Sequence, residues 1–152
     1  MAEYRLREDA ESWFKHIANQ APLRTKFDLY YFCLMLGLAT GRRSNPSENV
    51  KAQGFYDSMP EPYKNIQELI TGVLLRTEIA RFGIKLTDRT GVRRILTELV
   101  GSSGLSSVGI VRLNEYASGG FDVIFEHMLE APYTVSGFFG EYKKLMDLVM
   151  DK

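Results

Sequence analysis

The chain has 152 residues, of which 45% are hydrophobic and 25% charged, the composition of an ordinary soluble domain. We expect a single domain over residues 1–152, because this length supports one core without metals or disulfides. The 19 basic and 19 acidic residues cancel, so net charge indicates no particular class of partner. The single cysteine, Cys33, excludes an intrachain disulfide, and the N-terminal residues lack an apolar signal core. We therefore expect a cytoplasmic protein.

The segment 27–39 is apolar or aromatic on nearly every side and predicts a buried central helix over about residues 25–40. Thr25 is a suitable helix N-cap with Asp28 three residues later, and Gly41 is a suitable terminating residue. The apolar run is shorter than the roughly 20 residues that a membrane span requires. We therefore expect a helix at the centre of a core and no contact with a membrane.

Helical spacing predicts an amphipathic helix over about residues 7–20, which ends before Pro22. The polar stretch that follows the central helix shows neither helical nor strand periodicity and predicts the longest loop of the chain. Long loops in compact domains are often functional. Two more helices are predicted, one over about 63–82 and one that begins after the N-cap Asp88 and ends at Gly101.

Ser106 or Ser107 is expected to cap the next helix, and Thr134 to cap a C-terminal helix. Between them, Gly119 and Gly120 predict a structural hinge, since glycine adopts positive φ and turns one helix into the next. No segment alternates convincingly as a strand. The pattern predicts an all-α fold, a compact bundle of six to seven helices around the central helix.

The sequence offers little material for catalysis. The two histidines, His16 and His127, lie on separate predicted helices and lack the paired spacing of a metal site. Cys33 lies within the apolar helix, where cysteines usually pack as small hydrophobic residues. No phosphate-binding glycine loop and no nucleophile elbow occurs. We expect a protein that is not an enzyme and that binds no metal and no cofactor.

Charge is unevenly distributed along the chain. Residues 76–94 contain six basic side chains against two acidic ones, a net charge of +4. Residues 115–151 contain seven acidic side chains against two basic ones, a net charge of −5. This asymmetry fits either a nucleic-acid contact or head-to-tail self-association. Solvated helix faces of no further function are an equally valid interpretation.

The basic stretch has the order helix, glycine-bearing turn, helix that is typical of a helix-turn-helix motif. Arg89 and Arg93 share one helix face, four residues apart, and Arg94 lies beside them. Basic side chains also follow the central helix, although they would equally complement its negative C-terminal end. The residues predicted to bind nucleic acid are Arg42, Arg43, Lys85, Arg89, Arg93 and Arg94.

Two windows carry a resemblance to a known family. Residues 30–37 read Tyr-Tyr-Phe-Cys-Leu-Met-Leu-Gly and are followed by Gly-Arg-Arg at 41–43, and residues 114–121 read Asn-Glu-Tyr-Ala-Ser-Gly-Gly-Phe. Both windows resemble segments of small accessory proteins that are encoded with bacterial DNA phosphorothioation (sulfur-modification) and phage-defence genes. The first window resembles the apolar helix with a basic end in that family, and the second resembles its Glu-Tyr-Ala-x-Gly-Gly motif. The resemblance implies a non-catalytic component that works beside larger enzymes. The segment 121–152 departs from that pattern.

The leading hypothesis is a non-catalytic binding or adaptor subunit of a bacterial DNA-modification, restriction or phage-defence system. Its partner would be DNA or a larger protein subunit of the same system. The alternative is a structural helical protein that forms homo-oligomers through its oppositely charged regions.

Overall fold

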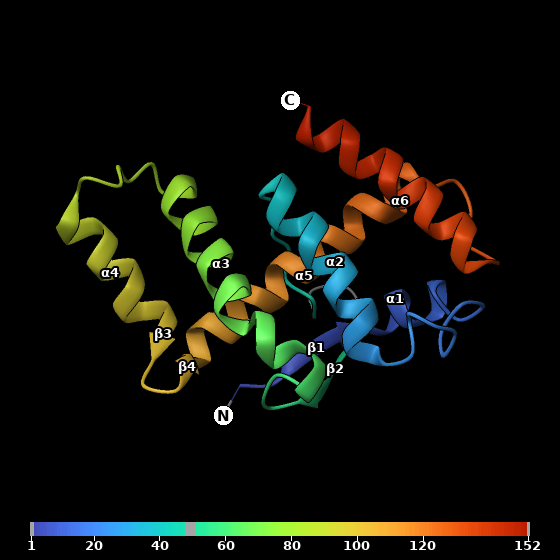
Figure 1. Cartoon of the computed structure of the whole chain (residues 1–152), viewed down its shortest axis with the longest axis horizontal. Coiled ribbons are helices and arrows are strands. Elements are labelled where there is room, and N and C mark those ends of the chain that lie inside the picture. Colours follow the sequence, from blue (N-terminus) through green and yellow to red (C-terminus); the bar gives the residue numbers. More distant parts are fainter. Residues whose placement is uncertain (1, 48–50, 152) are drawn as a thin grey trace. The chain divides into compact units, whose positions relative to one another are not determined.

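The computed structural model of the protein describes residues 2–47 and 51–151 and is mostly helical (Figure 1). Its described residues form two compact units. The first unit comprises residues 2–4 and 56–113, and the second unit comprises residues from 5–55 and 114–151. The prediction of one domain over residues 1–152 stays a prediction. The elements are β1 (Tyr4–Arg7), α1 (Glu8–Trp13), α2 (Lys26–Thr40), β2 (Ala52–Tyr56), the 3-10 helix η1 (Glu61–Ile66), α3 (Gln67–Arg81), α4 (Arg89–Leu99), β3 (Val100–Gly101), β4 (Gly104–Leu105), α5 (Ser107–His127) and α6 (Val135–Met150).

The predicted central helix is confirmed as α2, which forms the core of the second unit. Thr25 Oγ1 accepts the backbone N–H of Asp28 at 3.2 Å, and the Asp28 carboxylate accepts the backbone N–H of Thr25 at 2.9 Å. This reciprocal capping box fixes the start of the helix. Gly41, with φ 71°, ends it in the left-handed conformation that glycine adopts without strain. The side chains of α2 with no exposed surface are Phe27, Tyr30, Cys33, Leu34 and Leu36, whereas Met35 is half-buried.

Helix α5 contacts α2 and the residues just after it at three glycines, where the backbones leave no room for a side chain. A Cβ atom on Gly120 would lie 1.7 Å from the carbonyl oxygen of Cys33, and one on Gly37 would lie 1.8 Å from that of Tyr116. A Cβ atom on Gly119 would lie 2.1 Å from the carbonyl oxygen of Arg42. Only glycine at these positions lets the helices approach so closely.

The predicted hinge at Gly119 and Gly120 is therefore wrong. Helix α5 runs through both glycines without interruption, and the residues with positive φ lie elsewhere in the chain. A glycine pair serves either a left-handed turn or a close backbone approach. In this protein the glycine pair serves the close backbone approach, because α5 lies against α2 at this point.

The all-α prediction is correct only in that the protein is mostly helical, because the described residues also contain two small two-stranded sheets. One pairs β1 with β2, and the other pairs β3 with β4 in antiparallel register, with Val100 opposite Leu105. In β1 the side chains of Tyr4 and Leu6 are buried and Arg5 between them is exposed, which is strand alternation over only four residues. A strand this short gains its stability from a partner strand that is remote in sequence.

The predicted helix over 7–20 is also shorter than expected. Helix α1 ends at Trp13, and turns follow as far as Asn19, whose φ is 69°. Phe14 and Ile17 nonetheless remain fully buried. The apolar periodicity therefore identified the buried side chains of this segment correctly but not its backbone conformation.

Helix α6 begins after Thr134, as predicted, whose Oγ1 accepts the backbone N–H of Gly137 at 3.0 Å. The helix packs on α2, where the Tyr142 hydroxyl donates to the carbonyl oxygen of Phe32 at 2.7 Å. Aromatic rings from α1, α2, α5 and α6 meet at centroid distances of 5.0–6.4 Å. Offset and edge-to-face pairs of this kind stabilise the core of the second unit.

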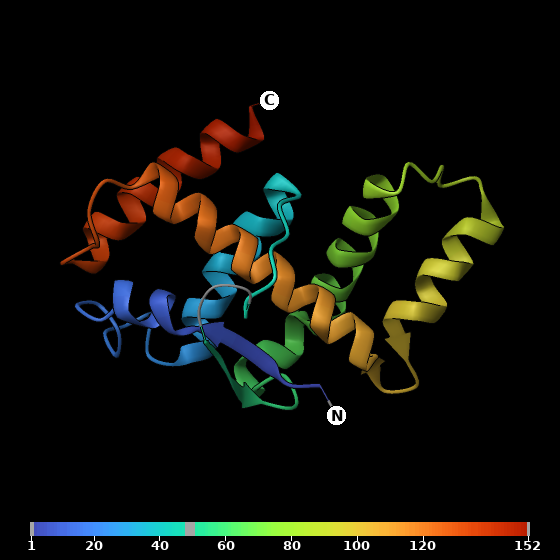
Figure 2. The ribbon, with the colours of Figure 1, turned by 180° about the vertical axis from the view of Figure 1, so that it is seen from behind.

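In the first unit, α3 and α4 lie side by side and run in opposite directions (Figures 1 and 2). Gly83, with φ 67°, follows the end of α3, and the Asp88 carboxylate accepts the backbone N–H of Gly91 at 3.1 Å at the start of α4. The pair is therefore a helical hairpin. A helix-turn-helix motif, by contrast, crosses its two helices at about 90–120°. The predicted order of elements is correct, but the helix-turn-helix geometry is not.

Replacing Gly120 by alanine tests the contact between α2 and α5. We expect Gly120→Ala to lower the free energy of unfolding by about 3 kcal/mol or more, because the new methyl group meets rigid backbone atoms. Gly140→Ala is the matched control, since Gly140 is exposed on α6 with no atom within 4 Å of its Cβ position. There alanine should stabilise the helix by about 0.5–1 kcal/mol. Equal effects of the two substitutions in chemical denaturation would show that the helices do not touch.

The burial of Cys33 is testable through its thiol chemistry. Burial raises the pKa of the Cys33 thiol to about 12, above the ordinary value of about 8.5. In the folded protein the reactive thiolate should therefore remain scarce as the pH rises from 7 to 9.5, whereas it becomes abundant in the unfolded chain. We expect iodoacetamide to label native protein at least about 100-fold more slowly than protein in denaturant, as followed by mass spectrometry. Comparable rates in the two states would contradict the buried position.

Candidate nucleic-acid interface

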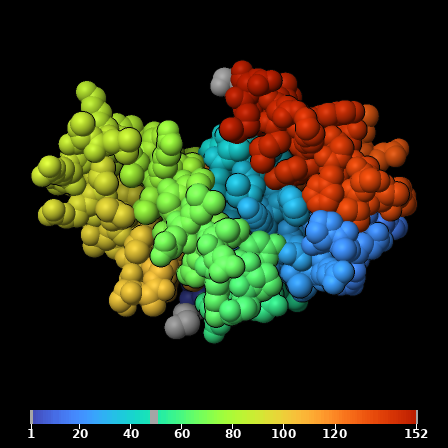
Figure 3. Space-filling model, in the orientation of Figure 1, coloured from blue at the N-terminus to red at the C-terminus, as the bar shows by residue number. Residues whose placement is uncertain are grey.

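The outward side of α4 carries three of the six residues that were predicted to bind nucleic acid, and a fourth, Lys85, lies just before the helix. Ile95 and Leu99 are buried, and α4 packs against α3. This arrangement leaves the charged side chains of the helix in solvent, and Figure 3 shows this part of the chain at the surface of the protein. The exposed cations, here called the α4 basic face, are Lys85, Arg89, Arg93 and Arg94.

The cations of the α4 basic face form no ion pair among the described residues, although Glu98 lines the same surface depression as Arg93 and Arg94. Within the part of the chain that the structure describes, no carboxylate lies within ion-pair distance of any of its four cations. The carboxylate nearest in sequence, Asp88, accepts the backbone N–H of Gly91 instead. Four formal positive charges are thus exposed to solvent and able to pair with an external anion.

The surface of α4 is nearly flat. A shallow, open depression of about 480 Å³ is lined by Arg93 and Arg94 together with Thr90, Thr97 and Glu98. A small metabolite would remain largely in solvent there, whereas specific small-molecule sites bury most of their ligand. Guanidinium and hydroxyl groups on an open helix suit an extended polyanion, whose phosphates these groups bind in many complexes.

Arg42 and Arg43 do not belong to the α4 basic face, because they follow α2 in the second unit. The Arg42 guanidinium donates to both oxygens of the Glu126 carboxylate, at 2.6 and 2.7 Å. This bidentate pair holds the pKa of Glu126 below its ordinary value and raises the pKa of Arg42. Arg43 is half-buried. The structure therefore places four of the six predicted residues in one surface and pairs Arg42 within the chain.

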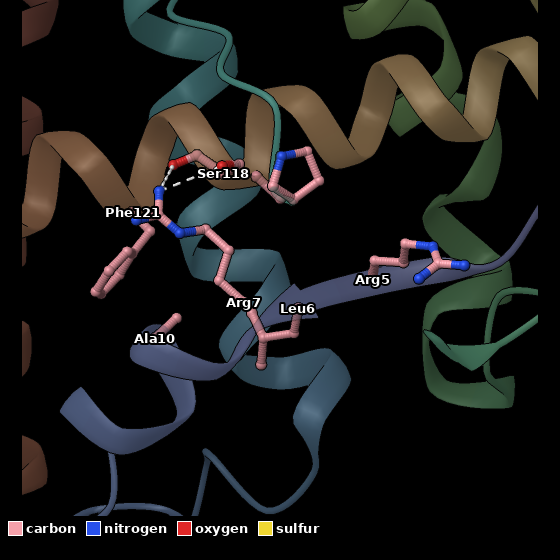
Figure 4. A pocket seen from close by; sticks show the side chains of 8 residues that line it. Arg5, Leu6, Arg7, Ala10, Ser118 and Phe121 are labelled. Atoms are coloured by element: carbon pink, nitrogen blue, oxygen red, sulfur yellow. Dashed lines mark hydrogen bonds between the residues drawn. The ribbon is translucent and has the colours of Figure 1, made fainter. Parts of the chain in front are cut away.

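A second charged cluster, which the sequence did not reveal, surrounds Arg7 in the second unit, and Figure 4 shows Arg7 beside Ser118 and Phe121. Its guanidinium donates to Asp122 at 2.5 Å, to Asp9 at 2.6 Å and to the Ser118 hydroxyl at 3.3 Å. It also lies over the Phe121 ring, 5.1 Å from the centroid. The described residues around it leave no space for even a water molecule. We interpret this cluster as structural, because no ligand fits there.

The two histidines do not form a site with each other. His16 is exposed and stacks on Tyr133 at a centroid distance of 4.5 Å, while Nδ1 of His127 lies 2.9 Å from the carbonyl oxygen of Val123. In residues 2–47 and 51–151, no three His, Cys, Asp or Glu side chains are grouped so that they could hold a metal ion. That the protein lacks a metal, a cofactor and enzymatic activity stays a prediction.

Comparison with family models, with curated proteins and with solved structures gave no match to this chain. None of the helices in the described residues is long and apolar enough to cross a membrane. The resemblance to DNA-modification accessory proteins therefore rests on residues 30–43 and 114–121 alone. In the structure these two windows contact each other, since Gly37 meets Tyr116 and Gly120 meets Cys33.

Proposed function

We propose that this protein is a non-enzymatic binding module that contacts nucleic acid through the α4 basic face. The proposal depends on one observation, which is that four exposed cations on and beside one helix have no carboxylate partner among the described residues. Arg and Lys side chains are the principal phosphate ligands of proteins, and each phosphate that they neutralise releases counterions. A neutral chain can bind nucleic acid in this way, because four of its 19 basic residues are gathered on and beside one helix.

The spacing of the arginines supports this proposal. Arg89 and Arg93 are one helical turn apart, which separates them by about 6 Å along the helix axis. Adjacent phosphates of one DNA strand are separated by roughly 6–7 Å, because each rise of about 3.4 Å is combined with rotation about the axis, so the two guanidinium groups match adjacent phosphates of one strand. Thr90 and Thr97 line the same surface and offer hydroxyl groups to phosphate oxygens. A single helix of this width also fits the major groove.

Self-association through opposite charges is the alternative, and the structure weakens it. Four of the seven carboxylates of residues 115–151 have a cation in their own chain, so this region offers a second copy less charge than its net of −5 indicates, although the exposed pairs of Glu141 and Asp147 would yield to a better partner. The ion pairs in question are Arg7–Asp122, Arg42–Glu126, Lys144–Glu141 and Lys143–Asp147. We therefore rank a polyanion above a second copy as the partner of the α4 basic face.

The wider role that we propose is that of an accessory subunit of a bacterial DNA-modification, restriction or phage-defence system. The resemblance in residues 30–43 and 114–121 supports this role, and the nucleic-acid contact proposed above is compatible with it. A larger protein subunit of the same system would then supply the chemistry.

The salt dependence of binding tests the α4 basic face. We expect the affinity for duplex DNA to fall steeply with salt, with a log–log slope of about −0.9 per phosphate contact. Arg89, Arg93 and Arg94, replaced together by alanine, should flatten this slope by up to about 3 units. The fold should survive, because exposed helix positions tolerate alanine. Fluorescence anisotropy over a salt series measures the slope, and circular dichroism checks the fold.

Lys143→Ala with Lys144→Ala is the matched control, since it removes two exposed helical cations of the second unit. Arg42→Ala tests the predicted residue that is paired with Glu126. Neither variant should change the slope as the α4 variant does. The proposal fails if wild-type protein ignores both single and double strands at low salt. It also fails if the α4 variant binds as tightly, and with the same slope, as wild type.

A further inference from the structure

An open cleft of about 560 Å³ lies in the second unit, at the connection between α5 and α6. Its lining includes Met128 and Phe138, which are 9% and 1% exposed and form an apolar base. Leu129 and Tyr133, from the connecting segment, also line the cleft. It lies outside the α4 basic face, and the proposed function makes no use of it.

The apolar side chains of this connection are unusually exposed. Leu129 is 101% exposed, Tyr133 is 70% exposed, and Phe125 in the last turns of α5 is 63% exposed. Single exposed apolar residues are common, but a group beside an apolar cleft is typical of an interaction surface. Aromatic side chains and methionine, both present here, are enriched at protein interfaces.

Two carboxylates among the lining residues give the cleft negative charge. Glu130 has no cation within ion-pair distance among the described residues. Glu141 contacts only Lys144, at 3.3 Å, and both side chains are more than half exposed. An exposed pair of this kind contributes little free energy and yields readily to a better partner. The cleft therefore combines an apolar base with available negative charge.

We infer that this cleft binds a basic segment of a partner protein, with one apolar side chain of that segment on Met128 and Phe138. Arg or Lys residues beside the apolar anchor would then pair with Glu130 and Glu141. Carboxylates exclude a nucleic acid or an anionic membrane surface from the same place, since both are negatively charged. A central anchor with flanking charge complementarity is the usual design of a peptide-binding cleft.

Selection from a random dodecapeptide library on phage tests this inference with the full-length protein as bait. We expect the enriched peptides to combine Arg or Lys with Leu, Met or Phe. Their synthetic forms should bind about tenfold or more weakly to the variant Glu130→Lys with Glu141→Lys, because like charges now meet. Tyr133→Ala should also weaken binding, since it removes apolar contact area. Fluorescence anisotropy with labelled peptides measures both changes.

The matched control is Asp57→Lys with Glu68→Lys, which changes the net charge equally at exposed positions of the first unit. It should bind the peptides within about twofold of wild type, as should the α4 triple variant. Circular dichroism identifies any variant that has lost its fold. If the variant Glu130→Lys with Glu141→Lys does not fold, the neutral variant Glu130→Gln with Glu141→Gln takes its place in the binding measurement. Enrichment of acidic peptides, or no enrichment over the charge-reversed bait, would overturn the inference. Equal binding by wild type and both cleft variants would overturn it as well.

Discussion

The backbone contact between α2 and α5 is the constraint on which the second unit depends. At Gly37 and Gly120 the two helices approach so closely that a methyl group on either would overlap backbone atoms of the other, and Gly119 meets the backbone of Arg42 just after α2 in the same way. Such overlap is costly, because backbone atoms cannot move aside as flexible side chains do. Helix α5 also supplies Asn114, whose side-chain oxygen accepts the Tyr30 hydroxyl at 2.7 Å, and Ser118, whose hydroxyl accepts a hydrogen bond from Arg7. The position of α5, which the glycine contact fixes, therefore also places Asn114 beside Tyr30 and Ser118 beside Arg7.

This contact changes the meaning of the resemblance to DNA-modification accessory proteins. The two windows that carry it, 30–43 and 114–121, are the two sides of the α2–α5 contact, and their glycines have a complete explanation in packing. The residues that we propose to bind nucleic acid lie outside both windows, on and beside α4. Fold and function are thus argued from different parts of the chain. A protein that shared only residues 30–43 and 114–121 with this chain would be expected to pack two helices in the same way. Its similarity there would say nothing about which surface binds nucleic acid.

The sequence predicted the features that depend on residues close together in the chain and missed those that depend on residues remote in sequence. The capping box of Thr25 and Asp28, the N-cap Asp88 and the N-cap Thr134 are local signals, and the helices that they begin were predicted correctly. The continuity of α5 was missed, because a glycine pair permits both a turn and a close approach, and only the neighbouring helix distinguishes them. Strand β1 and the pairing of Arg42 with Glu126 were missed for a similar reason, since their partners are remote in sequence. The cleft between α5 and α6 likewise arises only from tertiary packing.

We propose that α4 meets nucleic acid, whereas the α2–α5 contact serves the fold. The most direct measurement is a titration of isotope-labelled protein with duplex DNA, followed residue by residue through backbone amide chemical shifts. We expect the amide signals of residues 85–98 to shift as DNA is added, and these shifts should be smaller at higher salt. The signals of residues 33–37 and 116–120 should change little. Shifts centred on the second unit, or no shifts at low salt with protein and DNA in the high micromolar range, would contradict it.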